Sequence, residues 1–176
     1  MSNTPKKPLS VDRRFVLKIT AAATGVTALS PLLASAQRKG DEPTGQTAIL
    51  HLDDNQGLDV AALNPGELVI VATAGTFYGI LHRSDKQIAA AQSTDQTRDP
   101  VADSARTINA LYLVIDMACP HRGCQVGYDS EADEPFACPC HRSRFDASGR
   151  VLGGPARANL SVPSYEIEGT VITFTS

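Results

Sequence analysis

The stretch that decides the fold reads Cys-Pro-His-Arg-Gly-Cys at residues 119–124 and Cys-Pro-Cys-His at residues 138–141. All four cysteines of the chain lie inside it. Each half combines thiols with one imidazole, and residues 125–137 between the halves leave enough chain for two facing loops. This pattern predicts two loops that close over one inorganic centre.

Two plainer interpretations use the same residues. One is a structural zinc site of the Cys2His2 kind, and the other is a pair of disulfides with incidental histidines. A zinc site has no need of two extra cysteines, and a disulfide scaffold has no reason to place a histidine in both loops. Metal analysis with an electron paramagnetic resonance (EPR) spectrum separates these alternatives from an iron-sulfur site.

The stretch resembles the Rieske [2Fe-2S] family, whose pattern is Cys-x-His-x-Gly-Cys followed by Cys-x-Cys-His-x-Ser. The resemblance implies one [2Fe-2S] cluster, with two thiolates on one iron and two imidazoles on the other, which raises the reduction potential above that of an all-cysteine cluster. It also implies a disulfide that ties the two loops together. The implied site residues are Cys119, His121, Cys138 and His141 as iron ligands, Ser143 as a hydrogen-bond donor to the cluster, and Cys124 and Cys140 as the disulfide.

Composition limits the fold and the partners. A chain of 176 residues, 42% hydrophobic and 20% charged, fits one globular domain plus an N-terminal appendage. Aromatic residues make up only 5% and Trp is absent, so the core must be aliphatic. Residues 1–36 hold five Lys/Arg and one Asp, which leaves 11 Lys/Arg against 18 Asp/Glu for the rest. This acidic remainder argues against nucleic-acid binding.

The N-terminus is predicted to be an export signal. Residues 10–18, Ser-Val-Asp-Arg-Arg-Phe-Val-Leu-Lys, resemble the twin-arginine signature, and a weakly apolar run, residues 19–36, follows. The run ends in Ala-Ser-Ala, a cleavage candidate. The twin-arginine route carries folded cargo, which suits a cluster inserted before export and a disulfide formed afterwards. A chance Arg pair on a surface helix is the plainer alternative.

We therefore expect the domain on the periplasmic side of a bacterial inner membrane. The segment of residues 1–36 is either cleaved at Ala36 or kept as a membrane anchor, and the sequence leaves both open. Residues 37–45, which are polar with Gly and Pro, predict a linker.

The remainder, residues 46–176, predicts an all-β domain. Ser-Asp-Lys-Gln at residues 84–87 has the form of a capping box, so one short helix is expected over residues 87–92. The charged residues 94–106, which include Pro100, predict a loop. Strands are predicted, from apolar and β-branched runs between turn signals, at residues 46–52, 67–73, 76–82, 110–117, 126–128, 135–137, 144–146, 151–152, 164–167 and 171–175.

Short strands at regular spacing indicate an antiparallel β-sandwich. The family resemblance adds that the cluster lies in a small inserted subdomain, at about residues 119–155. It also implies that residues 153–156, Gly-Gly-Pro-Ala, form a loop that covers the cluster.

Flanking residues narrow the resemblance. Residues 63–67, 82–88, 99–106 and 154–160 look like the Rieske subunit of bacterial cytochrome bc-type quinol-oxidising complexes. Such a subunit takes one electron from a quinol bound by cytochrome b and passes it to a c-type cytochrome, and it is not catalytic alone. By position, His141 is then the residue that contacts the quinol.

Three residues depart from that family. Arg122 stands where Leu is usual, Arg142 where Gly is usual, and Phe145 in place of a Tyr that donates to a cysteine sulfur. A charge is costly to bury in an apolar docking surface unless it is paired. Losing a donor destabilises the reduced, more negative state, so we predict a lower reduction potential. Alternatively, Phe145 only packs the subdomain.

Two further functions remain open. One is a soluble periplasmic Rieske carrier, or the small subunit of another redox enzyme of the arsenite-oxidising kind, and the other is a zinc-binding module without redox activity. The arginines at the cluster end suggest either an acidic partner or a solvated rim; they are Arg122, Arg142, Arg144, Arg150 and Arg157. His51 and His82 are predicted to be ordinary surface or core residues.

Overall fold

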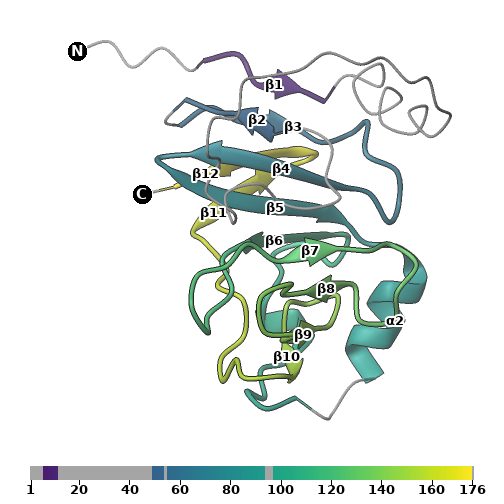
Figure 1. Ribbon diagram of the computed structural model, residues 1–176. Helices are drawn as coiled ribbons and strands as arrows, with labels where there is room; N and C mark the ends of the chain where they lie inside the picture. The colour runs from purple at the N-terminus through teal and green to yellow at the C-terminus, as the bar shows by residue number, and fades with distance from the viewer. Residues whose placement is uncertain (1–5, 12–48, 54, 94–96, 176) are drawn as a thin grey trace, which may run out of the picture.

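The computed structural model describes residues 6–11, 49–53, 55–93 and 97–175. Most of the regular structure in this part is β-strand, and α2 is its α-helix (Figure 1). The elements in chain order are β1 (Leu9–Ser10), β2 (Ile49–His51), β3 (Leu58–Asp59), β4 (Leu68–Thr73), β5 (Thr76–His82), α2 (Asp85–Ser93), the 3-10 helix η1 (Asp103–Ala105), β6 (Tyr112–Asp116), β7 (Gly127–Tyr128), β8 (Phe136–Ala137), β9 (Arg144–Phe145), β10 (Val151–Gly153), β11 (Tyr165–Glu168) and β12 (Val171–Phe174).

The strands form three four-stranded sheets. We call them the outer sheet (order β1-β3-β12-β11), the middle sheet (β2-β4-β5-β6) and the small sheet (β10-β9-β8-β7). Seven of the strand pairs are antiparallel, while β1 with β3 and β2 with β4 are parallel. The predicted antiparallel all-β fold is confirmed.

The middle sheet separates two hydrophobic cores. Successive side chains of a strand point to opposite faces. On β6, Leu113 and Ile115 accordingly pack in the core shared with the small sheet, and Tyr112 and Val114 pack in the core shared with the outer sheet. Both faces are therefore buried, which explains why this strand is almost continuously apolar in sequence.

Local signals predicted most of these elements. The capping box at the start of α2 is confirmed: the Gln87 N–H donates to Ser84 Oγ at 3.3 Å, and the Ser84 N–H donates to Gln87 Oε1 at 3.0 Å. The hairpin of β11 and β12 turns at Gly169, whose φ is +60°. Such a conformation suits glycine because it lacks a Cβ atom.

Two short strands were not predicted. Leu9 and Ser10 of β1 pair with Leu58 and Asp59 of β3, and Val11 is buried against the outer sheet. Two-residue strands carry no readable alternation, so only the pairing reveals them. The predicted signal run, its cleavage candidate and the linker fall in residues 12–48, outside the described residues. Among the described helices, none has the length and hydropathy needed to cross a bilayer.

The predicted loop at residues 94–106 is partly wrong. Residues 103–105 form η1, and both Asp103 and Arg106 are buried. These two charged side chains can be buried because each has polar partners from segments distant in the sequence. The Arg106 guanidinium, for example, donates to the carbonyls of Ser148 and Leu160.

Candidate functional site

Two loops at the edge of the small sheet carry the predicted ligands. The first, residues 119–124, follows β6, and the second, residues 138–143, connects β8 to β9. Both loops have the same backbone hydrogen bonds. The N–H of the first residue donates to the carbonyl five residues on, and its own carbonyl accepts the N–H four residues on. The loops are therefore two copies of one turn.

The turn requires a left-handed residue at its fifth position. Gly123 fills it in the first loop with φ +74°, and Arg142 fills it in the second with φ +59°. L-residues with a Cβ atom rarely adopt this conformation. Glycine is therefore the unstrained choice, and Arg142 stands at a glycine position.

The four predicted iron ligands come together at these turns. The free thiols of Cys119 and Cys138 are each only 2% exposed. The His121 and His141 rings lie outside them, with centroids 4.7 Å apart and planes perpendicular. His121 is half-buried and His141 is exposed. Sulfur thus lies on the inner side of the site and nitrogen on the outer side.

The unpaired atoms of this site fit an iron-sulfur cluster. His121 Nδ1 is buried and has no hydrogen-bond partner in the described structure. A buried polar atom without a partner is costly, whereas a metal bond would satisfy it. Burial lowers the pKa of His121, and the nearby His141 and Arg122 lower it further. A low pKa favours the neutral imidazole, which is the form that binds metals.

Hydrogen-bond donors surround the Cys119 sulfur. Burial raises the pKa of the Cys119 thiol, and the neighbouring Cys138 thiol adds to this. Hydrogen bonds from the His121 backbone N–H and the Ser143 side chain act in the opposite direction, because they stabilise a thiolate. Ser143 is completely buried, and its Oγ also accepts the Ala156 N–H at 3.1 Å. The predicted donor Ser143 therefore lies beside a predicted ligand.

The remaining two cysteines join the loops. Cys124 and Cys140 form a disulfide, as predicted. Its sulfurs and that of Cys138 all lie within 4.8 Å of one another. Because the bond pairs two of these three sulfurs, this group is a covalent link beside the predicted ligands and not a separate three-thiol metal site.

A third segment closes over the second loop. Gly154 has φ +83°, and a Cβ atom there would lie 2.5 Å from Ser143 Cα and 2.6 Å from the Arg142 carbonyl oxygen. Only glycine allows so close an approach of two backbones. The Arg98 guanidinium also donates to the Gly154 carbonyl. The predicted covering loop at residues 153–156 therefore lies against the second loop.

The predicted basic cluster at this end needs correction. Arg150 is only 4% exposed and pairs with Asp146 at 2.7 Å. It contributes to the interior and not to the surface. Arg144 is exposed but pairs with Glu134 at 2.7 Å. The remaining three, Arg122, Arg142 and Arg157, are exposed.

A buried polar network behind the site was not predicted. Arg83, 1% exposed, follows β5 and pairs with Asp103 at 2.6 Å. The Ser148 hydroxyl, from the turn between β9 and β10, donates to the same carboxylate. Nothing in the local sequence separates these polar residues from exposed ones, because their partners lie 20 and 45 residues away.

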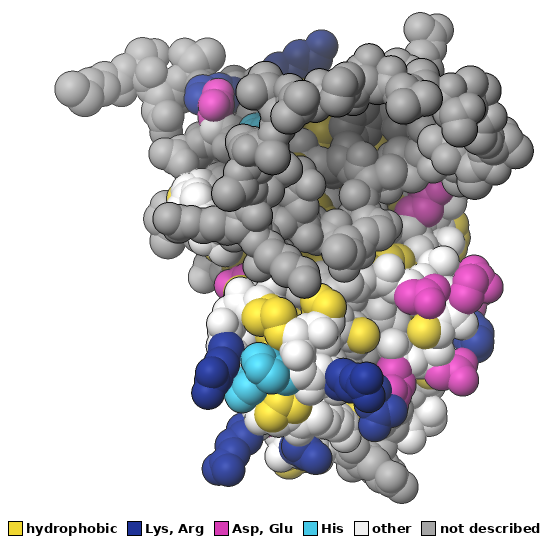
Figure 2. Space-filling view, viewed as in Figure 1, with side chains coloured by type: hydrophobic (Ala, Val, Ile, Leu, Met, Phe, Trp, Pro, Cys, Tyr) yellow, Lys and Arg dark blue, Asp and Glu magenta, His cyan; other side chains and the backbone are white. Residues whose placement is uncertain are grey.

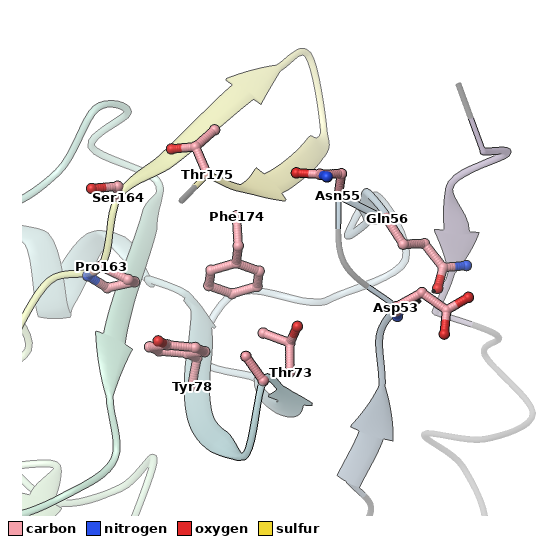
Figure 3. Close-up of a pocket in the computed structure, with 10 residues that line it drawn as sticks. Asp53, Asn55, Gln56, Thr73, Tyr78, Pro163, Ser164, Phe174 and Thr175 are labelled. Carbon is pink, nitrogen blue, oxygen red and sulfur yellow. Dashed lines mark hydrogen bonds between the residues drawn. The ribbon is translucent and has the colours of Figure 1, made fainter. Parts of the chain in front are cut away.

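The other histidines have ordinary surroundings, as predicted. His82 Nδ1 lies 2.8 Å from the Leu63 carbonyl oxygen, and His51 is exposed at the end of β2. A cavity of about 450 Å³ lies at the opposite end of the molecule, between β4, β5 and β12. Its lining includes the stacked rings of Tyr78 and Phe174 (Figure 3). It includes no residue of the two loops.

The chain resembles known proteins over most of its described length. The model of the Rieske [2Fe-2S] domain family matches residues 58–166. The ubiquinol-cytochrome c reductase iron-sulfur subunit of Rhodospirillum rubrum is 38% identical over 115 residues, which cover 61% of this chain and 63% of that protein. The subunit of the same name from Blastochloris viridis is 40% identical over 114 residues, which cover 62% of this chain and 63% of that protein.

A relative outside the bacteria and a solved structure also match part of the chain. The mitochondrial cytochrome b-c1 complex subunit Rieske of Schizosaccharomyces pombe is 37% identical over 117 residues, 65% of this chain and 51% of that protein. The matches thus span less than two thirds of each of these relatives. A hyperthermophilic respiratory Complex III chain superimposes with a TM-score of 0.47 at 20% identity, covering 67% of this chain and 72% of that chain. With its family pattern matched over residues 58–166, the chain belongs to the Rieske [2Fe-2S] domain family and carries one [2Fe-2S] cluster.

Proposed function

We propose that Cys119 and Cys138 hold one iron of the cluster and that His121 and His141 hold the other. The observation that carries this assignment is the meeting of two free buried thiols with two imidazoles, one of which has a buried nitrogen without a partner. Thiolate and imidazole are the ligand set of Rieske centres. Ser143 and the His121 backbone N–H stabilise the negative charge on the Cys119 sulfur.

We propose that the domain transfers single electrons as the iron-sulfur subunit of a quinol-cytochrome c oxidoreductase. The cluster, when bound, supplies a one-electron couple. The support is the 38–40% identity to two proteins named ubiquinol-cytochrome c reductase iron-sulfur subunit. The donor is then a quinol held by cytochrome b and the acceptor a c-type cytochrome. The subunit by itself catalyses no complete reaction.

His141 is the proposed contact with quinol. Its imidazole is exposed, while both thiols are buried, so it is the side of the site that a substrate reaches. An imidazole that uses one nitrogen for iron keeps the other for a hydrogen bond. With the cluster bound, that second nitrogen would accept the quinol hydroxyl proton, and the cluster would accept the electron that the quinol gives up.

The domain is proposed to work on the periplasmic side of a bacterial inner membrane. The disulfide supports an oxidising compartment, since such bonds rarely persist in the cytoplasm. Residues 1–36 would direct twin-arginine export and then be cleaved or remain as an anchor, with residues 37–45 as a linker to the domain at residues 46–176. Its cluster-binding subdomain comprises about residues 119–155.

A second candidate function is favoured by one observation. Arg122 is exposed in the first loop, where the resemblance to quinol-oxidising complexes leads us to expect an apolar residue. A soluble periplasmic carrier, or the small subunit of another redox enzyme of the arsenite-oxidising kind, has no need for an apolar quinol-docking surface. Co-purifying subunits distinguish the two: the first function requires a cytochrome b in the same membrane complex.

Ligand substitution tests the assignment of the site. We expect protein purified without oxygen to contain iron and acid-labile sulfide in equal amounts and to give the EPR spectrum of a reduced Rieske centre. Cys119→Ser and His121→Ala should abolish that spectrum, and the control His51→Ala should preserve it. Colourless wild-type protein after reconstitution with iron and sulfide, or zinc in place of iron, would contradict the assignment.

A further inference from the structure

Two exposed arginines flank the ligands at the two turns. Arg122 follows His121 in the first loop, and Arg142 follows His141 in the second. Neither guanidinium forms an ion pair or hydrogen bond with any residue in the described part of the chain. By contrast, Arg83 and Arg150 are buried in ion pairs, and Arg144 is paired with Glu134.

Basic side chains and histidine lie together on the surface of the lower half of the molecule (Figure 2). Exposed histidine atoms there have Lys or Arg atoms on either side, and acidic atoms gather away from them. The chain as a whole has a formal net charge of −3. A cationic surface on an acidic protein creates a local field opposite in sign to the overall charge.

The backbone adds an independent observation. The fifth position of each turn is left-handed, and Gly123 fills it without strain in the first loop. Arg142 adopts φ +59° at the matching position of the second loop. The fold therefore does not need a side chain at residue 142, and the arginine there strains the backbone. Strain of this kind, at a functional site, is evidence for a use of the side chain.

We propose that Arg122 and Arg142 form a cationic docking surface around His141 for a partner protein that presents clustered carboxylates. The inference rests on the proposed electron-transfer function and names the chemistry of the protein that meets the cluster end. Carboxylates on the partner pair with the two guanidinium groups and bring its redox centre close to the exposed imidazole. Such steering raises the association rate and weakens as salt is added.

Electron-transfer kinetics test the sign of the field at His141. Reduced holoprotein is oxidised either by hexacyanoferrate(III), an anion, or by tris(phenanthroline)cobalt(III), a cation. Each oxidant takes one electron from the protein and becomes its iron(II) or cobalt(II) form. We expect Arg122→Gln together with Arg142→Gly to lower the rate of oxidation by the anionic oxidant about tenfold at low ionic strength. The rate of oxidation by the cationic oxidant should stay the same or rise. The control Lys86→Gln, which removes one charge from α2, should change neither oxidation rate.

Binding and stability separate docking from a structural role. The wild-type holoprotein should bind an octaglutamate peptide at low ionic strength in isothermal titration calorimetry, and the double variant should lose this binding. Arg142→Gly should keep the wild-type EPR spectrum and should not lower the melting temperature, because glycine fits the left-handed conformation better than arginine. If that variant does not fold, the oxidation rates and the octaglutamate binding are measured on Arg122→Gln alone.

Three results would overturn the proposal. The first is equal loss of rate with both oxidants, and the second is octaglutamate binding that does not depend on the two arginines. The third is loss of binding to phosphatidylglycerol vesicles in the variants with unchanged oxidation rates, which would assign the arginines to lipid headgroups. Failure of the proposed function itself looks different, since wild-type protein would then lack a Rieske EPR spectrum.

Discussion

Phe145 shows how one residue links packing to redox chemistry. Its ring is completely buried in the core that contains Cys119 and Cys138. A tyrosine there would add a hydroxyl donor to the core that contains the sulfurs of the proposed ligands, where Ser143 now provides a side-chain donor to Cys119. Donors stabilise the reduced state because that state carries more negative charge.

We expect Phe145→Tyr to raise the reduction potential. A redox titration followed by EPR measures it, and Phe174→Tyr on the outer sheet is the control that adds a hydroxyl far from the site. An unchanged potential in Phe145→Tyr would mean that this ring only packs the core.

Gly154 provides a second prediction at the residue scale. An added Cβ would meet the backbone of Ser143 and Arg142 at 2.5–2.7 Å, and backbone atoms have little freedom to move away. Gly66 has a similar φ, +88°, but nothing lies within 4 Å of its Cβ position. Gly66→Ala should therefore cost only the left-handed strain, about 1–2 kcal/mol.

Gly154→Ala should cost clearly more, about 3 kcal/mol or above, because overpacking adds to the strain. Urea denaturation of both variants checks this, and the EPR spectrum of Gly154→Ala should change because the second loop is displaced. Equal costs for the two variants would show that the close approach of residue 154 does not matter.

At the scale of elements, the two turns depend on their disulfide. Cys124 and Cys140 are 16 residues apart, and closing a loop of this length removes unfolded-state entropy worth about 3 kcal/mol. The outer residues of the turns, such as Pro120 and Pro139, are exposed. The disulfide is thus the covalent link between the two halves of the site.

We expect the double variant Cys124→Ser, Cys140→Ser to lose about 3 kcal/mol of unfolding free energy. Thermal denaturation with and without a reducing agent checks this. The reductant should destabilise the wild type and leave the variant unchanged. A wild type that is insensitive to reduction would place the stability of the turns elsewhere.

At the scale of the whole molecule, the polar network of Arg83, Asp103 and Ser148 connects segments far apart in sequence. Burial by itself raises the pKa of Asp103, but hydrogen bonds from Arg83 and Ser148 and the charge of Arg83 outweigh burial and hold the pKa below 3.8. Because the folded-state pKa is lowered, the carboxylate stabilises the fold above pH 3.8, and this contribution is lost as the pH falls through the folded-state value.

Asp103→Asn should be destabilised by about 3–5 kcal/mol at neutral pH, because Arg83 is left buried without its ion pair. Its deficit relative to the wild type should narrow as the pH falls below 3.8, where the wild-type carboxylate also becomes neutral. Free energies of unfolding measured from neutral to acidic pH check this. A deficit independent of pH would show that folding does not change the pKa of Asp103, so that its charge does not stabilise the fold.

Much of the fold could be predicted from the sequence because the signals are local. The apolar run before Cys119 predicts a strand, now β6, and the capping box predicts the start of α2. The short strands β1 and β3 could not be predicted, since each exists only through its pairing partner.

For the site, the sequence by itself determined which side chains are available: four cysteines and two histidines at a spacing typical of Rieske loops. Only the tertiary structure decided which charges are inside. Arg150 is buried against Asp146, whereas Arg122 and Arg142 are exposed, although all three look alike in the sequence. The physical reason is that a charge can be buried only where a partner compensates its desolvation, and that partner is often brought near only by the packing of distant segments.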